Sequence, residues 1–140
     1  MRRRFAVAIL GAVVAILQPN LDAKTAQALQ PNEGRQLFVK YCASCHGTSA
    51  HGDGPAAEAL RVKPADLTQF ALRNGGIFPV ERTRRIIDGR EPGARAHGNL
   101  EMPVWGDAFQ VREGLTESAA RGRIEAIVYY IGSIQQRSGH

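Results

Sequence analysis

The sequence is poor in the residues that build most cross-links and metal sites, with two cysteines, two methionines and four histidines in 140 residues. Cys42 and Cys45 are separated by only two residues, and a disulfide across so short a span would be strained. A structural zinc site usually needs a second pair of ligands at short spacing, and His51 and His97 form no such pair. A disulfide framework and a zinc site are therefore both disfavoured.

A long hydrophobic run is also missing. The apolar stretch over residues 5–17 falls short of the roughly 20 residues that a helix needs to span a bilayer. Arg2, Arg3 and Arg4 precede it, and Ala26 and Ala28 form a small-x-small cleavage site after it. We predict a signal peptide over residues 1–28, general secretion to the periplasm, and one mature domain over residues 29–140. The alternative is a signal that stays uncleaved as a membrane anchor.

Runs of charge of one sign are absent as well, although the formal net charge is +5. Much of the positive charge lies in the predicted signal, so the mature domain is only mildly basic. Only Arg82, Arg84 and Arg85 cluster, and we interpret them as the solvated face of a helix. The charge pattern therefore predicts no nucleic-acid partner.

Strand patterns are absent too: no stretch alternates apolar and polar residues over any length, and no internal repeat is present. The mature chain instead predicts an all-α domain. We expect a helix that carries Phe38 into the cysteines, short helices within 56–62 and 65–73, and another from Pro79 to a stop at Gly89. Residues 91–107 should be irregular surface. The clearest helical stripe follows a cap at Thr116 and consists of Ile124, Ile127, Val128, Ile131 and Ile134.

Against these absences stands one strong motif, Cys42-Ala43-Ser44-Cys45-His46. Two thiols two residues apart with a histidine directly after the second are the attachment signature of a c-type haem. Each thiol adds across one vinyl group of the porphyrin, and the histidine is placed to bind the iron. A thioredoxin-type dithiol is the main alternative, but it requires a strand before the motif, where this sequence looks helical.

The second axial ligand of the iron decides the function, and Met102 is the candidate that we favour. It is the single methionine after the initiator, and it stands in a poorly apolar stretch before Pro103, which stiffens the backbone. Methionines more often fill gaps in cores. His97 is the serious competing ligand, His51 is too close in sequence to His46, and His140 is the terminal residue.

Together these residues resemble the class I c-type cytochromes, the bacterial single-haem relatives of mitochondrial cytochrome c. Gly34 and Phe38 precede the first cysteine by the eight and four positions typical of that family. Ile127 and Tyr130 resemble the pair against which the family's glycine packs where the terminal helices cross. The resemblance implies a small all-α cytochrome c fold, with four or five helices around one covalently attached haem and crossing N- and C-terminal helices.

Two further matches are weaker. Gly54-Pro55 resembles the family's Gly-Pro, whose proline carbonyl accepts a hydrogen bond from the iron-binding histidine, here His46. Met102-Pro103-Val104-Trp105-Gly106 resembles the loop of the distal ligand, in which the tryptophan packs beside the haem and reaches a propionate. The segment 75–97 departs from the minimal pattern, and we expect it to reshape either the haem crevice or a docking surface.

The resemblance implies an electron carrier rather than an enzyme. With His46 and Met102 on the iron, no position remains for a substrate, and electrons would pass to redox partner proteins in brief encounters. We expect a monomer without a stable membrane span. The alternatives are a haem subunit fixed in a larger oxidoreductase, and a haem enzyme or gas sensor if Met102 does not bind the iron.

Overall fold

The structure, a computed structural model, describes residues 32–91 and 102–136 and contains helices but no β-strand in these ranges. The predicted all-α class is therefore confirmed. The predicted signal peptide, His97 and His140 lie outside the described residues. The N-terminal helix covers residues 32–41 and is followed by α2 (Ala43–His46), η1 (Ala57–Ala59), η2 (Leu67–Gln69), α3 (Phe70–Arg73), α4 (Val80–Asp88), α5 (Trp105–Glu113) and α6 (Glu117–Ser133).

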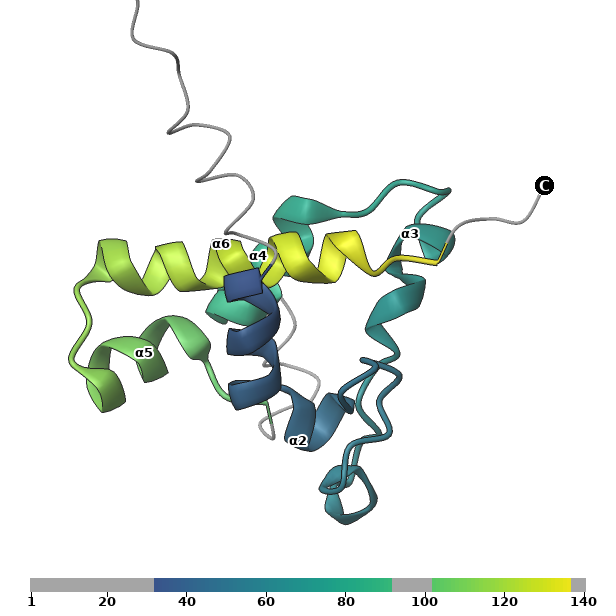
Figure 1. The fold of residues 1–140 in the computed structure, drawn as a ribbon, viewed down its shortest axis with the longest axis horizontal. Helices are drawn as coiled ribbons and strands as arrows, with labels where there is room; N and C mark the ends of the chain where they lie inside the picture. Colours follow the sequence, from purple (N-terminus) through teal and green to yellow (C-terminus); the bar gives the residue numbers. More distant parts are fainter. Residues whose placement is uncertain (1–31, 92–101, 137–140) are drawn as a thin grey trace, which may run out of the picture.

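The N-terminal helix lies across α6, as Figure 1 shows. The two helices touch at Gly34, where an added Cβ atom would lie 2.1 Å from the carbonyl oxygen of Ala126. One turn later the ring of Phe38 packs against that of Tyr130, with 5.3 Å between the ring centroids. The predicted crossing of the terminal helices at Gly34 is confirmed, because only a missing side chain permits this approach of the two backbones.

The core lies between these two helices and α5. The largest fully buried side chains are Phe38, Phe109, Ile124 and Ile127. The predicted apolar stripe of α6 is buried as far as Ile131, while the next member of the stripe, after the helix has ended, is only half-buried. The stripe therefore forms one wall of the core.

Two helix ends follow the predicted signals. The Thr116 side chain accepts a hydrogen bond from the Ala119 N–H at 3.2 Å and caps the start of α6. Gly89 ends α4 in the left-handed conformation, with a φ of 83°, which glycine adopts without strain. Pro79 directly precedes α4, as predicted.

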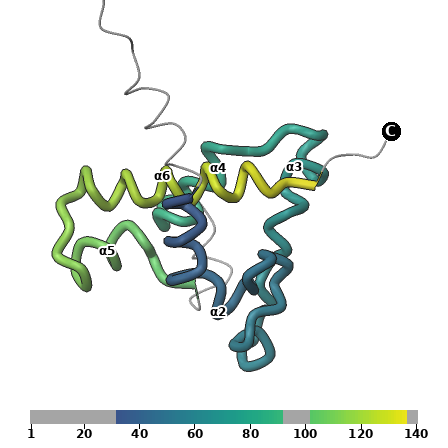
Figure 2. Tube along the Cα trace, in the orientation of Figure 1, coloured from purple at the N-terminus to yellow at the C-terminus, as the bar shows by residue number. Residues whose placement is uncertain are grey.

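Other elements differ from the sequence predictions. Helix α5 was not predicted, and it begins at Trp105, inside the stretch expected to be irregular. Trp105 and Phe109 pack against the core, but Val111 is 82 % exposed, so no apolar stripe runs the length of the helix. The expected helices within 56–62 and 65–73 are much shorter in the structure, namely η1, η2 and the four-residue α3. Helix α3 lies beside the C-terminal end of α6 (Figure 2).

Candidate functional site

A cavity of about 340 Å³ lies between the N-terminal helix, α2, the segment 60–67, α4 and α6. Cofactor sites commonly measure about 300–1,000 Å³ and are mostly apolar. The walls here follow that pattern, because Phe38, Ile87, Ile127 and Ile131 line them and Lys63 is the one fully charged side chain among the lining residues. The cavity therefore suits a flat, largely apolar group.

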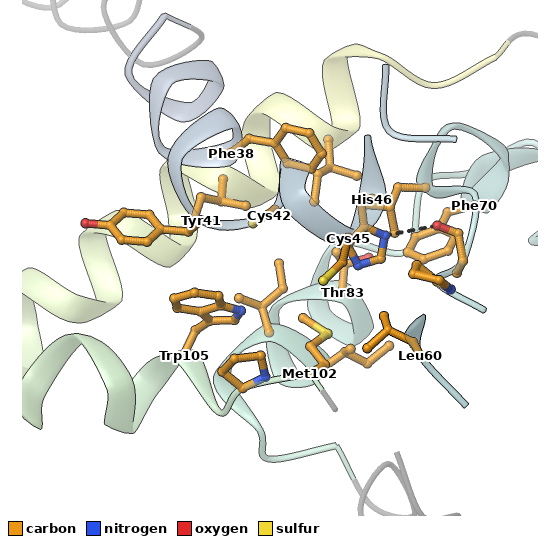
Figure 3. A pocket seen from close by; sticks show the side chains of 18 of the residues that line it. Phe38, Tyr41, Cys42, Cys45, His46, Leu60, Phe70, Thr83, Met102 and Trp105 are labelled. Carbon is orange, nitrogen blue, oxygen red and sulfur yellow. Dashed lines mark hydrogen bonds between the residues drawn. The ribbon is translucent and has the colours of Figure 1, made fainter. Parts of the chain in front are cut away.

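Cys42, Cys45 and His46 all line this cavity (Figure 3). Cys42 stands at the break between the N-terminal helix and α2, and its carbonyl oxygen accepts hydrogen bonds from the N–H groups of Cys45 at 3.1 Å and His46 at 2.9 Å. This tight turn brings the three side chains to one side of the chain. The sequence motif is thus one local structural unit that faces the cavity.

The two cysteines are not bonded to each other, and both are half-buried. Burial, reinforced by the nearby Cys45, raises the pKa of the Cys42 thiol to about 12. A redox-active dithiol needs the opposite, a thiolate stabilised by a lowered pKa. The electrostatics of Cys42 therefore argue against a thioredoxin-type role.

His46 is held by a hydrogen bond between its Nδ1 atom and the carbonyl oxygen of Ala65, at 3.1 Å. A carbonyl oxygen only accepts, so Nδ1 carries the proton and Nε2 keeps a free lone pair. Burial lowers the pKa of the imidazole, and the bond to Ala65 offsets this only in part. His46 is therefore a neutral imidazole with one nitrogen available, which is the form that binds metals.

The identity of this carbonyl corrects one sequence prediction. Pro55 was expected to supply it, but the structure assigns the role to Ala65, and Pro55 is exposed and does not line the cavity. Gly54 packs against the back of α2 instead, where an added Cβ atom would lie 2.4 Å from the carbonyl oxygen of Ser44. The Gly54-Pro55 turn therefore supports the motif from behind rather than from the cavity side.

Met102 and Trp105 approach the same cavity from the segment that leads into α5 (Figure 3). Met102 lies outside any helix and is half-buried. The ring of Trp105 contacts those of Tyr41 and Phe109, with centroids 5.4 Å and 5.3 Å away. The structure thus brings both predicted residues together with the cysteines and His46.

Sequence reasoning left the role of the segment 75–97 open and missed the individual side chains of α4 that line the cavity. Thr83, Ile86 and Ile87 line the cavity, and the buried Thr83 hydroxyl donates a hydrogen bond to the carbonyl oxygen of Pro79 at 2.9 Å. The predicted departure from the family pattern over 75–97 therefore shapes the cavity, as far as its described part to residue 91 goes. The spacing of Thr83 and Ile87, four residues apart on one helical face, is the signal that could have revealed this wall.

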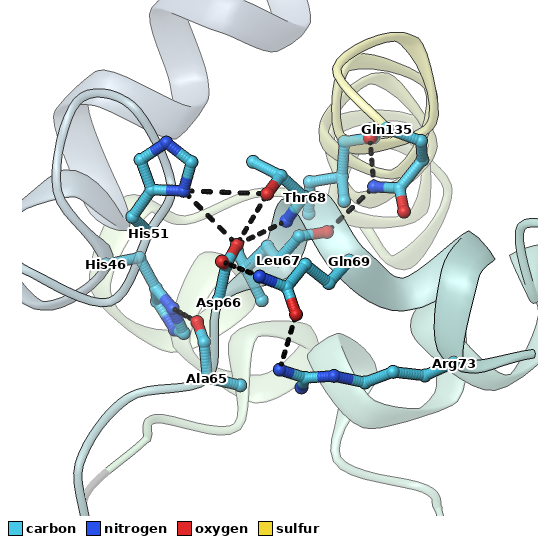
Figure 4. A network of polar contacts seen from close by, with 10 residues as sticks. His46, His51, Ala65, Asp66, Leu67, Thr68, Gln69, Arg73 and Gln135 are labelled. Atoms are coloured by element: carbon cyan, nitrogen blue, oxygen red, sulfur yellow. Dashed lines mark hydrogen bonds and ion pairs between the residues drawn. The ribbon is translucent and has the colours of Figure 1, made fainter. Parts of the chain in front are cut away.

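A polar network behind His46 was also missed (Figure 4). The Asp66 side chain accepts hydrogen bonds from the backbone N–H and the hydroxyl of Thr68 and from the amide of Gln69. His51 lies beside it, with Nδ1 3.4 Å from the same carboxylate. An aspartate followed two residues later by threonine, just before an apolar helix start, is a capping signal that could have been noticed.

The donor set fits a haem. Two thiols on one side suit covalent attachment, a neutral histidine suits an axial position, and the thioether of Met102 suits the other. Within residues 32–91 and 102–136, no group of three or more His, Cys, Asp and Glu side chains could hold a metal ion.

None of the helices in the described part of the chain has the length and apolar character needed to cross a membrane. No curated protein and no solved structure matches the chain significantly. A family model does match: cytochrome c oxidase, cbb3-type, subunit III, over residues 29–120. That match covers most of the chain, including the cysteine motif, His46 and Met102, so this protein belongs to the c-type cytochrome family of cbb3-type oxidase subunit III.

Proposed function

We propose that this protein carries single electrons on one haem c, attached through Cys42 and Cys45 and ligated by His46 and Met102. When bound, the haem supplies a one-electron iron couple. The observation that carries the proposal is His46 in the cavity beside both thiols, with Nδ1 committed to Ala65 and Nε2 free. Membership of a c-type cytochrome family supports an electron-transfer role.

The residues of the chain divide the work in this proposal. Cys42 and Cys45 hold the group at one edge, and His46 binds the iron on one side. Met102 supplies a thioether on the other side, which favours reduced iron and raises the reduction potential. Phe38, Ile127 and the other apolar wall residues exclude water from the site.

Spectroscopy of the protein from a host that matures c-type cytochromes tests the attachment and the ligands. We expect haem that stays with the denatured chain, a sulfur-to-iron band in the oxidised form, and no spectral change when carbon monoxide meets the reduced form. Colourless protein would contradict the attachment. High-spin iron or carbon monoxide binding would favour the alternative of an enzyme or gas sensor.

A variant tests Met102 directly. Met102→Ala should lower the reduction potential, remove the sulfur-to-iron band and allow carbon monoxide to bind, because no thioether then fills the sixth position. The matched control is Val111→Ala on α5, since Val111 is 82 % exposed and should leave all three readouts unchanged. A Met102→Ala protein with the wild-type spectrum would refute this ligand and return attention to His97.

We also propose export to the periplasm with cleavage after Ala28. The support is the sequence pattern of three arginines, an apolar run and a small-x-small site. Cell fractionation and the mass of the mature protein test this proposal. A chain that keeps residues 1–28 and sediments with membranes would show an anchor instead.

A second candidate is a haem subunit fixed in a larger oxidase, and the family match favours it because the matched family is named for such a subunit. The apolar stripe of α6 does not support a fixed partner, because Ile124, Ile127 and Ile131 are buried in the core and form no exposed apolar surface. Purification from native membranes separates the two. Elution as a lone monomer supports the free carrier, and co-elution with a haem-containing oxidase supports the subunit.

A further inference from the structure

The carbonyl that holds His46 lies in a segment without regular structure, so something other than a helix must fix its direction. Residues 63–66 have no helical or strand hydrogen bonds of their own. The His46–Ala65 bond joins residues 19 positions apart. The orientation of the imidazole therefore depends on the contacts of Ala65 and its neighbours.

Asp66, the residue after Ala65, is held by hydrogen bonds to its side chain. Its Oδ1 atom accepts hydrogen bonds from the Thr68 backbone N–H at 2.9 Å and from the Thr68 hydroxyl at 2.6 Å. Its Oδ2 atom accepts from the Gln69 side-chain amide at 2.8 Å. Three hydrogen bonds to one carboxylate cap η2 and immobilise the peptide that carries the Ala65 carbonyl.

The capped turn is itself anchored to the end of α6 (Figure 4). The Gln135 side-chain amide donates to the carbonyl oxygen of Leu67 at 2.7 Å, and its own oxygen accepts from the Ala71 N–H at 2.8 Å. Thr68 is 4 % exposed. Leu67 is also buried, whereas Asp66 is half-buried and His51 is exposed. The buried part of the turn ties the network to the core, so the network can hold the Ala65 carbonyl in place.

The charge of Asp66 is maintained by its partners. Partial burial raises the pKa of this carboxyl, but the hydrogen bonds from Thr68 and His51 outweigh that effect and lower the pKa below its ordinary value. The basic side chains that reach toward it are His51 directly and Arg73 through Gln69. Asp66 is thus an ionised hydrogen-bond acceptor at neutral pH, as a strong cap requires.

We propose that Asp66 is a positioning residue for the axial ligand: by capping η2 it holds the Ala65 carbonyl against Nδ1 of His46. The inference rests on the proposed function, since it concerns the histidine that binds the iron. A firm hydrogen bond at Nδ1 makes the imidazole a more basic ligand, which favours oxidised iron. Loss of the cap loosens this bond and raises the reduction potential.

The test compares Asp66→Ala with Asp66→Asn in the haem-loaded protein. Both variants remove the charge, but asparagine caps a helix about as well as aspartate, whereas alanine does not cap. Two readouts are needed: the reduction potential, and hydrogen exchange of the His46 Nδ1–H followed by NMR in the reduced state. Glu58→Gln, an exposed carboxylate on η1, controls for a change of charge in the same lobe.

The proposal expects Asp66→Ala to raise the potential further than Asp66→Asn does, and to speed Nδ1–H exchange roughly tenfold. Asp66→Asn should keep exchange close to the wild-type rate. Equal potential shifts in the two variants, with exchange unchanged in both, would mean that Asp66 acts only through its charge, and the proposal would be wrong.

Thr68→Val provides a second route if Asp66→Ala does not assemble. It removes the hydroxyl donor at 2.6 Å while keeping both the shape of the side chain and the charge of Asp66. The potential and the exchange rate should move in the same direction as in Asp66→Ala, by a smaller amount, and no movement would overturn the proposal. A wild-type protein whose spectrum shows no histidine on the iron would overturn the proposed function as well, whereas normal ligation with unresponsive variants would overturn only the role of Asp66.

Discussion

Gly34 is the residue at which the N-terminal helix and α6 come into backbone contact. An added Cβ atom would lie 2.1 Å from the carbonyl oxygen of Ala126 and 2.9 Å from the Cβ atom of Tyr130. Neither atom is the end of a flexible side chain, so the helices would have to separate. We expect Gly34→Ala to lower the free energy of unfolding by about 1–3 kcal/mol, although alanine favours a helix, as measured by chemical denaturation.

Gly122 supplies the matched control for this substitution. It also lies in a helix, α6, but an added Cβ atom there would have no neighbour within 4 Å. Gly122→Ala should therefore raise the free energy of unfolding by roughly 0.5–1 kcal/mol. If Gly34→Ala stabilised the protein as Gly122→Ala does, the close crossing of the two helices would be wrong.

At the scale of residues, contacts between neighbours in the sequence could be predicted, and contacts between distant residues could not. The side chains of Cys42, Cys45 and His46 could be assigned to one site because one turn of backbone places them together. The acceptor of His46 could not, because Ala65 reaches it only through the fold of the intervening loop. A carbonyl also carries no side-chain signal, so nothing in the sequence distinguished Ala65 from Pro55.

At the scale of elements, α5 is held between its neighbours by Glu113. Tyr41 of the N-terminal helix and Arg123 of α6 both donate hydrogen bonds to this carboxylate, and Lys40 lies 3.8 Å from it. The ring of Tyr41 also contacts that of Phe109, which lies on α5 with Glu113, with 5.2 Å between the ring centroids. One side chain thus joins three helices beside the aromatic wall of the cavity.

This arrangement predicts a pH dependence of stability. The hydrogen bond from Tyr41, followed by that from Arg123, lowers the pKa of Glu113 in the folded protein. A group with a lowered folded pKa stabilises the protein above its unfolded value, near 4.5, and loses that contribution as the pH falls through the folded value. Glu113→Gln should therefore be less stable than the wild type at pH 7, with a gap that narrows below about pH 4.5.

Denaturation midpoints of the two proteins at several pH values between 3 and 7 provide the measurement. Glu58→Gln serves as the control, because Glu58 is exposed on η1 and should produce no gap at any pH. A Glu113→Gln gap that stayed constant across this range would show that shape, rather than ionisation, matters at this position.

Helices with a cap or an apolar stripe in their own sequence were predictable, and helices stabilised by contacts with other elements were not. Helix α6 has a cap at Thr116 and an apolar stripe, and both could be recognised. Helix α5 has no side-chain cap at Val104, and its contacts with Tyr41 and Arg123 come from distant parts of the chain. Tertiary contacts therefore stabilise a helix that local preference alone does not indicate.

At the scale of the whole molecule, the cavity is as important to stability as to function. A void of about 340 Å³ would cost about 8 kcal/mol if it stayed rigid and dry, at about 24 cal/mol per Å³. This is an upper bound because water can enter an open cavity, yet it is comparable with the entire stability of a typical domain, about 5–15 kcal/mol. A group that fills the cavity would therefore form part of the core.

Replacement of the two cysteines that we propose to attach the haem tests this dependence. Cys42→Ala with Cys45→Ala should abolish denaturant-resistant haem and, with it, most of the helical signal in far-UV circular dichroism. Ser44→Ala, which changes an exposed residue between the two cysteines, should keep both. A double variant that retains haem after denaturation would show that the thiols are not the attachment points.

The overall architecture could be predicted further than its details. The resemblance carried by Gly34 and the cysteine motif implied two crossing helices beside a haem site, and the structure has the crossing with an apolar cavity beside it. The sequence could not decide whether the segment 75–97 shapes the crevice or a docking surface, because Thr83 and Ile87 reach the cavity through the packing of α4 against α5 and α6.

The position of Trp105 gives the molecule a built-in optical reporter. It is the single tryptophan of the chain, and its indole lines the cavity next to Tyr41 and Phe109. A porphyrin in that cavity would quench the fluorescence of Trp105 by energy transfer. The tryptophan emission should therefore be weak in the haem-loaded protein and increase on unfolding. Fluorescence from one native side chain would then follow the loss of the helical wall in real time, without any label.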